Sequence, residues 1–179
     1  MMWLRPKGNV CVRIPLDVKG CLYVSPMPSG SFDTGNKLFK IYRKLRIEVV
    51  VVLVTDEELE QKAECDVLAA YQENGIEPIR FPIEDFTSPE LYACTKVVDQ
   101  VTDCLCNGSR IAMHCNAGVG RTSVMAGCIV RNITGKTAPE AIDYVKQYMH
   151  VRMNDEQMRL VDRFVPLAER LGSAEGFKK

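Results

Sequence analysis

Apolar residues follow this chain in short strand-like runs that are separated by longer amphipathic stretches. Two of the runs, Val49 to Val54 and Arg110 to Cys115, are dominated by apolar residues, as expected of central strands that are buried on both faces. Cys21 to Ser25 and Glu77 to Ile83 are also strand-like. Strands that alternate with helical stretches predict an α/β fold with a central, mostly parallel mixed sheet and helices on both faces.

The helical stretches between the strands carry recognisable start and stop signals. Thr55 with Glu58 and Thr137 with Glu140 have the spacing of a capping box, and Gly108 is a typical helix stop. The expected helices run from Asp33 to Lys44, from Thr55 to near Gly75, from Ser88-Pro89 to Asn107-Gly108, from Arg121 to Ile133, from Thr137 onward, and from Asn154 to Leu171. Neither an internal repeat nor a linker is evident, so residues 1–179 are expected to form a single domain with its core from about 20 to 171 and short tails.

The connection between the strand ending at Cys115 and the helix beginning at Arg121 carries the candidate chemistry. Its two glycines allow the backbone to curl so that successive N–H groups point inward, and the helix start adds partial positive charge. Such a loop binds an anion such as phosphate. The residues expected to bind it are Asn116, Ala117, Gly118, Val119, Gly120 and Arg121.

Cys115 and Arg121 stand at the two ends of this loop. The helix start and the arginine favour a thiolate, so we expect Cys115 to be ionised at neutral pH and to act as a nucleophile. Arg121 offers a planar fork that can bind two phosphate oxygens at once. A buried structural thiol would not need two glycines nearby. The pair Cys104 and Arg110 has the same spacing, but it runs from a helix end into a strand and is discarded.

The full string His114-Cys115-x-x-Gly118-x-Gly120-Arg121-Thr122 resembles the signature of the cysteine-dependent protein tyrosine phosphatase superfamily, of the compact dual-specificity type. Upstream, Pro82-x-x-Asp85 followed by Pro89 resembles the mobile loop that carries the general acid in that superfamily. The resemblance covers about residues 20 to 170 and implies a phosphotyrosine phosphatase-like fold.

The resemblance also implies roles for individual residues. Cys115 would attack phosphorus to form a phosphocysteine while Asp85 protonates the leaving oxygen, and Asp85 would then act as base toward water. Thr122 would hydrogen-bond the departing sulfur, and Gln157 would position the water. Neither a cofactor nor a metal is expected, because Arg121 and the backbone N–H groups supply the positive charge.

Several of these assignments have alternatives. Asp85 could merely shape a turn, with Glu84 as the substitute carboxylate. Gln157 fits equally well as the capping-box residue of a helix whose N-cap is Asn154. His114 is expected to tie the loop by hydrogen bonds, next to the thiolate.

Composition narrows the setting. The chain has 179 residues, 46% of them apolar and 26% charged, and a formal net charge of zero, so it lacks the basic footprint of a nucleic-acid or membrane-surface protein. The sequence has eight cysteines and shows neither a secretory leader nor an apolar span of membrane length. We therefore expect a protein of the reducing cytoplasm, for which entry into the nucleus is also possible. We expect a monomer. A second thiol near Cys115 could trap it as a disulfide, but the sequence does not identify one.

The predicted function is therefore hydrolysis of phosphotyrosine and phosphoserine or phosphothreonine in a phosphorylated protein or peptide. Phosphoinositides are less favoured, because Asn116, Ala117 and Val119 bring no lysine into the loop. A module that binds phosphoproteins without turnover is the alternative from another class. The segment Tyr148 to Met153 lacks the Arg-Pro-Gly stretch that relatives often carry, so the pocket wall is expected to differ there.

Overall fold

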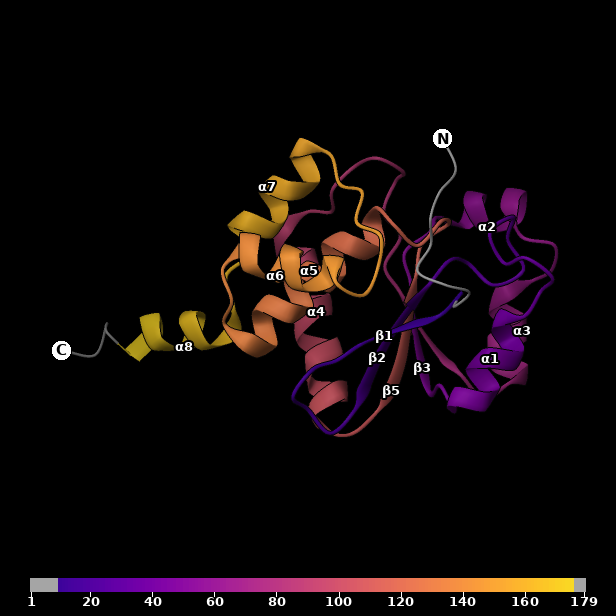
Figure 1. Ribbon diagram of the computed structural model, residues 1–179, viewed down its shortest axis with the longest axis horizontal. Helices are drawn as coiled ribbons and strands as arrows, with labels where there is room; N and C mark the ends of the chain where they lie inside the picture. Colours follow the sequence, from indigo (N-terminus) through magenta and orange to yellow (C-terminus); the bar gives the residue numbers. More distant parts are fainter. Residues whose placement is uncertain (1–9, 176–179) are drawn as a thin grey trace.

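The computed structural model describes residues 10–175, in which five strands form one mixed sheet (Figure 1). The strand order is β1-β2-β5-β3-β4, and β1 is antiparallel to β2 while the other pairs are parallel. The predicted α/β class and mostly parallel mixed sheet are confirmed. The strands are β1 (Val12–Ile14), β2 (Cys21–Ser25), β3 (Val49–Val52), β4 (Glu77–Arg80) and β5 (Arg110–His114).

The central strand β5 lies between β2 and β3, with Met113 in register with Val24 on one side and Val51 on the other. The four valines of β3 are all buried, as their unbroken apolar run predicts. Three strands, β3, β4 and β5, end earlier than expected, β5 by a single residue. Beyond β4, the N–H groups of Phe81 and Ile83 still reach the end of β3, but Pro82 has no N–H to continue the ladder. The short edge strand β1 was not predicted.

Helices cover both faces of the sheet (Figure 1). In Figure 1, α1, α2 and α3 lie on one side of the sheet, and α4, α5, α6 and α7 lie on the other, with α8 extending away from the sheet. The helices are α1 (Leu38–Leu45), α2 (Asp56–Lys62), α3 (Val67–Glu73), α4 (Leu91–Cys106), α5 (Arg121–Thr134), α6 (Ala138–Lys146), α7 (Asp155–Arg163) and α8 (Leu167–Glu175). None of them is long and apolar enough to span a bilayer.

The expected helix from Asp33 was wrong at its start, because α1 begins at Leu38. The Asp33 carboxylate accepts hydrogen bonds from the N–H groups of Ser29, Lys37 and Leu38, and so caps the helix from a distance. Asn36, in between, has a φ of 49°, which is outside the helical region.

The helix expected from Thr55 to near Gly75 is two helices. The predicted capping box of Thr55 and Glu58 is present and begins α2, which ends at Lys62. A second cap then starts α3, where the side chain of Asp66 accepts from the N–H of Ala69. The cap residue Asp66 was the sequence signal for this break.

The last expected helix, Asn154 to Leu171, is also split. Its predicted N-cap is correct, since the Asn154 side chain accepts from the N–H of Gln157 at 2.9 Å. The helix α7 nevertheless ends at Arg163, and α8 begins only after Pro166. A proline inside a helix removes a backbone hydrogen bond and clashes with the preceding turn, which accounts for the break.

The helix α5 lies at the centre of its layer, and twelve of its residues are buried. It packs against α4, α6 and α7. A Cβ atom built on Gly127 would lie 3.2 Å from Cγ1 of Val161, so a small residue allows α7 to lie close to α5. This contact joins the middle of α5 to the later part of α7, and the N–H of Arg152, just before α7, donates to the carbonyl of Val119, just before α5.

Candidate active site

The loop of residues 115–120 follows the carboxyl end of the central strand β5 and leads into α5. Gly118 has a φ of 73°, and a Cβ atom there would lie only 2.5 Å from the carbonyl oxygen of Ser25. The N–H of Met27 also donates to the carbonyl of Asn116 at 3.0 Å. The chain after β2 therefore holds the loop closely, and only glycine fits at position 118.

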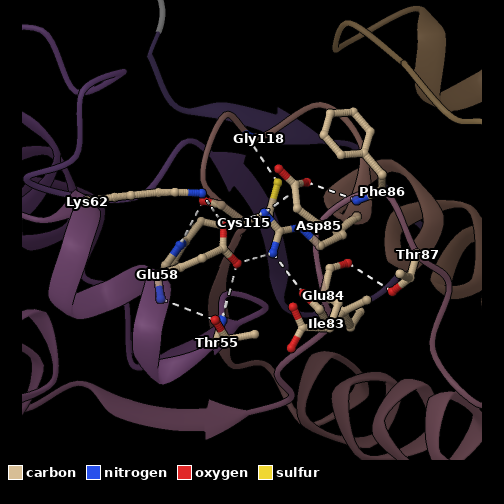
Figure 2. A network of polar contacts seen from close by, with 12 residues as sticks. Thr55, Glu58, Lys62, Ile83, Glu84, Asp85, Phe86, Thr87, Cys115 and Gly118 are labelled. Carbon is tan, nitrogen blue, oxygen red and sulfur yellow. Dashed lines mark hydrogen bonds and ion pairs between the residues drawn. The ribbon is translucent and has the colours of Figure 1, made fainter.

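Cys115 lies at the base of this loop and is 3% exposed. Its Sγ accepts a hydrogen bond from the N–H of Gly118 at 3.2 Å (Figure 2). This N–H points into the loop toward the sulfur, as the predicted curl of the backbone requires.

Arg121, the first residue of α5, is 2% exposed and is held by three groups from other elements. Its Nη1 donates to the carbonyl of Ile83 at 2.8 Å and to Oε2 of Glu58, and its Nη2 donates to Oε1 of Glu58 at 3.0 Å. Nη2 also lies 3.2 Å from Oδ1 of Asp85. Figure 2 shows Glu58, Asp85 and Cys115 in one network of polar contacts.

The guanidinium of Arg121 therefore has two different edges. Glu58 occupies the end edge, formed by Nη1 and Nη2. On the side edge, Nε is buried and has no hydrogen-bond partner within residues 10–175. Such an edge, formed by Nε and Nη2, can take two oxygens of one phosphate.

Glu58 is a site residue that the sequence indicated only as a helix cap. Its carboxylate completes the capping box of α2. It also forms ion pairs with Lys62, whose Nζ lies 2.8 Å from Oε1, and with Arg121. Burial by itself would raise the pKa of Glu58, but the hydrogen bonds from Arg121 and Lys62 outweigh burial and lower the pKa to about 2. Glu58 is therefore a stable counter-ion behind the arginine. Nothing in the sequence relates it to Arg121, 63 residues away.

The loop from Pro82 to Pro89, predicted to carry the general acid and called the acid loop below, brings Asp85 next to Arg121. Oδ1 of Asp85 also accepts from the N–H of Phe86 at 3.1 Å. Phe86 has a φ of 63° and is 73% exposed, which is an unusual conformation for a bulky residue. The alternative carboxylate, Glu84, belongs to the turn of the loop, where its carbonyl accepts from Oγ1 of Thr87 at 2.9 Å.

The start of α7 holds the acid loop in place. Three side chains reach it: Asn154 Nδ2 donates to the carbonyl of Phe86, Gln157 Nε2 donates to the carbonyl of Thr87 at 2.9 Å, and Glu156 accepts from Ser88. Gln157 is buried, and its Oε1 accepts from the N–H of Asn154 at 3.2 Å. The capping-box alternative for Gln157 is thus present, while its role toward water stays a prediction.

Thr122 and Asn116 have unpartnered buried oxygens. Oγ1 of Thr122 and Oδ1 of Asn116 have no hydrogen-bond partner within the described part of the chain. By contrast, the next hydroxyl along α5, Oγ of Ser123, donates to the carbonyl of Val119 and steadies the loop. The predicted action of Thr122 on the departing sulfur stays a prediction.

His114 is fully buried and ties the loop to α3, as expected. Its Nδ1 lies 3.2 Å from the carbonyl of Cys115, which can only accept, so Nδ1 carries the proton. Nε2 therefore accepts from the hydroxyl of Tyr71 at 2.8 Å. The pKa of His114 is lowered to about 4, mainly by burial and in smaller part by the charges of Arg80 and Arg121, which together outweigh the hydrogen bond to Cys115. The ring is neutral at pH 7.

The segment that departs from the expected Arg-Pro-Gly pattern still lines the loop. The N–H of Arg152 donates to the carbonyl of Val119 at 3.0 Å, and a Cβ atom on Gly120 would lie 3.4 Å from the carbonyl oxygen of Arg152. Among the described residues, all eight cysteines are free, and no group of three or more histidine, cysteine or acidic side chains is placed to hold a metal ion.

Comparison with known proteins identifies the family to which this chain belongs. The family model for cyclin-dependent kinase inhibitor 3 (CDKN3) matches residues 34–142, from just before α1 into α6. This chain belongs to the CDKN3 family. The family is of the dual-specificity phosphatase type, within the cysteine-dependent protein tyrosine phosphatase superfamily, and the predicted resemblance is confirmed.

Human cyclin-dependent kinase inhibitor 3 is 28% identical over 141 residues, which cover 65% of this chain and 66% of the relative. The rat protein is 30% identical over 101 residues, which cover 56% of this chain and 48% of the relative. The match thus spans about half to two-thirds of these relatives.

Solved structures confirm the fold. The kinase associated phosphatase KAP, with serine in place of its catalytic-site cysteine, aligns with a TM-score of 0.76 at 20% identity, covering 87% of this chain and 93% of that one. PTPMT1 in complex with PI(5)P aligns with a TM-score of 0.73 at 15% identity, covering 94% of this chain and 99% of that one.

Proposed function

We propose that this member of the CDKN3 family is a protein phosphatase that hydrolyses phosphotyrosine and phosphoserine or phosphothreonine through a phosphocysteine on Cys115. The observation that carries the proposal is the position of Arg121. Its side edge has an unpartnered Nε, its end edge is held by Glu58, and Asp85 lies 3.2 Å from its Nη2.

Substrate binding uses groups that are already oriented. The phosphate enters the loop, where the backbone N–H groups and the side edge of Arg121 hold its oxygens. Glu58 stays on the other edge and keeps the guanidinium plane fixed. Asp85 exchanges its contact with Nη2 for the ester oxygen of the substrate, because the phosphate takes its place on Arg121.

The first chemical step transfers the phosphoryl group to sulfur. The Sγ–P bond forms as the P–O ester bond breaks, and protonated Asp85 gives its proton to the leaving oxygen. In the second step, water attacks phosphorus, Asp85 takes a proton from it, and the P–S bond breaks. Oγ1 of Thr122 donates to the departing thiolate. The products are the free hydroxyl and inorganic phosphate.

The relatives suggest which substrates to test first. Human cyclin-dependent kinase inhibitor 3 and the kinase associated phosphatase KAP are both named for an association with kinases, so a phosphorylated kinase is the first protein substrate we propose. The fold shared with PTPMT1, solved with PI(5)P, keeps phosphoinositides as the second class, although the loop itself brings no lysine.

The experiment is hydrolysis of phosphotyrosine and phosphothreonine peptides of matched sequence and of a phosphoinositide, under reducing conditions with a chelator. Cys115→Ser serves as the blank, and Arg121→Lys tests the side edge of the guanidinium. We expect release from the peptides that both variants abolish or nearly abolish. Tight phosphopeptide binding without release would instead indicate a non-catalytic phosphoprotein reader, and preference for the lipid would make it a phosphoinositide phosphatase.

A further inference from the structure

The acid loop ends at Ser88-Pro89, where the serine joins the loop to α7. We propose that Ser88 is phosphorylated by a proline-directed serine/threonine kinase, and that this phosphate detaches the acid loop from α7 and slows the phosphatase reaction. The inhibitory part of this proposal rests on the proposed function.

The sequence offers two serines that precede proline, Ser25 and Ser88. Ser25 is 3% exposed, and its hydroxyl is engaged with the hydroxyl of Tyr42 at 2.7 Å, so a kinase cannot reach it. Ser88 is half-buried and follows the exposed residues Phe86 and Thr87 on the surface of the loop. Pro89 biases the backbone of Ser88 toward extended conformations.

The hydroxyl of Ser88 has one specific partner. Its Oγ donates to Oε1 of Glu156 at 2.7 Å, and its backbone N–H points to the same oxygen at 3.4 Å. Phosphorylation removes the O–H donor and adds about 1.5 to 2 negative charges at pH 7. The new group would then face a carboxylate at hydrogen-bond distance, and the two must separate.

Acidic side chains outnumber basic ones around Ser88. Asp155 and Glu156 both lie in the first turn of α7, where their negative charges already interact with the positive end of the helix dipole. At the start of α4, the carboxylate of Glu90 already accepts from the N–H groups of Tyr92 and Ala93. Glu84 and Asp85 lie on the loop itself. The arginines of α7 are Arg159, three residues beyond Glu156, and Arg163, which lines a pocket with Glu90 at the start of α4. Within residues 10–175, the hydrogen bonds of Ser88 are with Glu156 and with neither of these arginines.

The expected consequence follows from what the loop carries. Asn154, Glu156 and Gln157 together hold residues 86–88, and this segment directly follows Asp85. The phosphate would remove the hydrogen bond between Ser88 and Glu156 and add repulsion between these two residues. The loop would then move, and Asp85 with it, away from the leaving oxygen. Cys115 and Arg121 lie on other elements, and Arg121, although it loses its contact with Asp85, keeps those with Glu58 and the carbonyl of Ile83. Phosphorylation should therefore lower kcat while leaving KM nearly unchanged. The decrease in kcat should be larger for a substrate with a poor leaving group, which depends more on the proton from Asp85.

The modification itself is a balanced transfer from ATP. A bond forms between Oγ of Ser88 and the γ-phosphorus, the bond from that phosphorus to the β–γ bridging oxygen breaks, and ADP leaves. The hydroxyl proton passes to the base of the kinase.

The test has two parts, of which the first asks whether a kinase phosphorylates Ser88 and the second measures what the phosphate does to activity and to the loop. In the first, the full chain is incubated with MgATP and a panel of purified proline-directed kinases, and mass spectrometry locates the phosphate, with Ser88→Ala as control. In the second, phosphoserine is incorporated at position 88 during synthesis, and its occupancy is checked by mass before and after each assay. Kinetics with phosphothreonine and aryl phosphate substrates, and hydrogen exchange of the amides of residues 86–88, are then compared with unmodified protein.

We expect phosphate on Ser88 of the wild type and none at that position in Ser88→Ala. Phosphoserine should lower kcat about 10- to 100-fold for phosphothreonine and less for the aryl phosphate, with faster exchange of the loop amides. Glu156→Gln keeps an acceptor but removes the charge, so phosphoserine should inhibit that variant less. Ser88→Ala itself should stay within about threefold of wild type, because two of the three ties remain.

Three results would overturn the proposal: no phosphate at Ser88 with any kinase of the panel, an unchanged or raised kcat in fully phosphorylated protein, or inhibition confined to KM. Failure of the proposed function is a separate result, because the unmodified protein would then be inactive. In that case hydrogen exchange still decides whether the phosphate releases the loop, and slower or unchanged exchange would refute the release.

Discussion

Glu58 and Arg121 lie 63 residues apart in the chain and form a buried ion pair, with Oε1 of the glutamate 3.0 Å from Nη2 of the arginine. The same carboxylate completes the capping box with Thr55. One side chain thus fixes both the start of α2 and the orientation of the arginine. Because Glu58 takes only the end edge, it leaves the side edge of Arg121 for phosphate.

Glu58→Gln should disturb Arg121 without removing an acceptor for the helix cap. The amide cannot neutralise the buried guanidinium, so we expect a loss of about 10- to 100-fold in kcat/KM and of about 3 kcal/mol in the free energy of unfolding. Steady-state kinetics and urea unfolding measure the two effects. Thr55→Ala is the matched control, because it removes the cap alone at a cost of about 1 kcal/mol. Wild-type kcat/KM in Glu58→Gln would show that Arg121 is oriented by other groups.

The two loop glycines should differ sharply when each is changed to alanine. At Gly118, φ is 73° and the added Cβ would meet the Ser25 carbonyl oxygen at 2.5 Å, so the loop must distort. At Gly120, the nearest atom is 3.4 Å away, which is ordinary contact. We expect at least a 100-fold loss of activity from Gly118→Ala and a loss of about tenfold or less from Gly120→Ala. Equal effects would contradict the close approach to the chain after β2.

Asp85→Asn should slow hydrolysis by roughly two to four orders of magnitude for a poor leaving group and much less for a good one. The amide can no longer supply a proton, while Cys115 and Arg121 remain in place. A series of aryl phosphates of graded leaving-group basicity measures the effect. Glu84→Gln, on the same loop, should stay near wild type. A larger loss in Glu84→Gln than in Asp85→Asn would reverse the assignment of the acid.

The buried His114 should make the fold sensitive to mild acid. Its pKa in the folded state is about 4 against 6.5 for a free histidine, so between these pH values the unfolded chain binds the extra proton more readily. The free energy of unfolding should therefore fall as pH drops from 6.5 to 4, by about 3 kcal/mol from this group. Urea unfolding at several pH values measures the slope.

His114→Asn should reduce that slope, at the cost of lower stability at pH 7. A wild-type slope in His114→Asn would mean that other groups cause the acid sensitivity.

The sequence by itself determined the features that are local along the chain. The strand that begins at Arg110, the glycine-bearing loop and the helix starting at Arg121 are neighbours in sequence, so spacing and residue type were enough to predict them, with the end of the strand one residue too late. The capping boxes at Thr55 and Asn154 are also local, since each joins residues three apart. The α/β order and the mostly parallel sheet followed from the same alternation of apolar runs.

Only the tertiary structure decided which distant groups complete the site. Glu58 follows β3 and Asp85 follows β4, and the start of α7 reaches the acid loop through Gln157, 70 residues from Thr87. Along the sequence, nothing relates Glu58 to Arg121 or Gln157 to Thr87, and Asp85 was expected at the site only from the family resemblance. They meet because β5, β3 and β4 are neighbouring parallel strands, whose carboxyl ends lie at one edge of the sheet, and because α7 packs on α5 beside that edge.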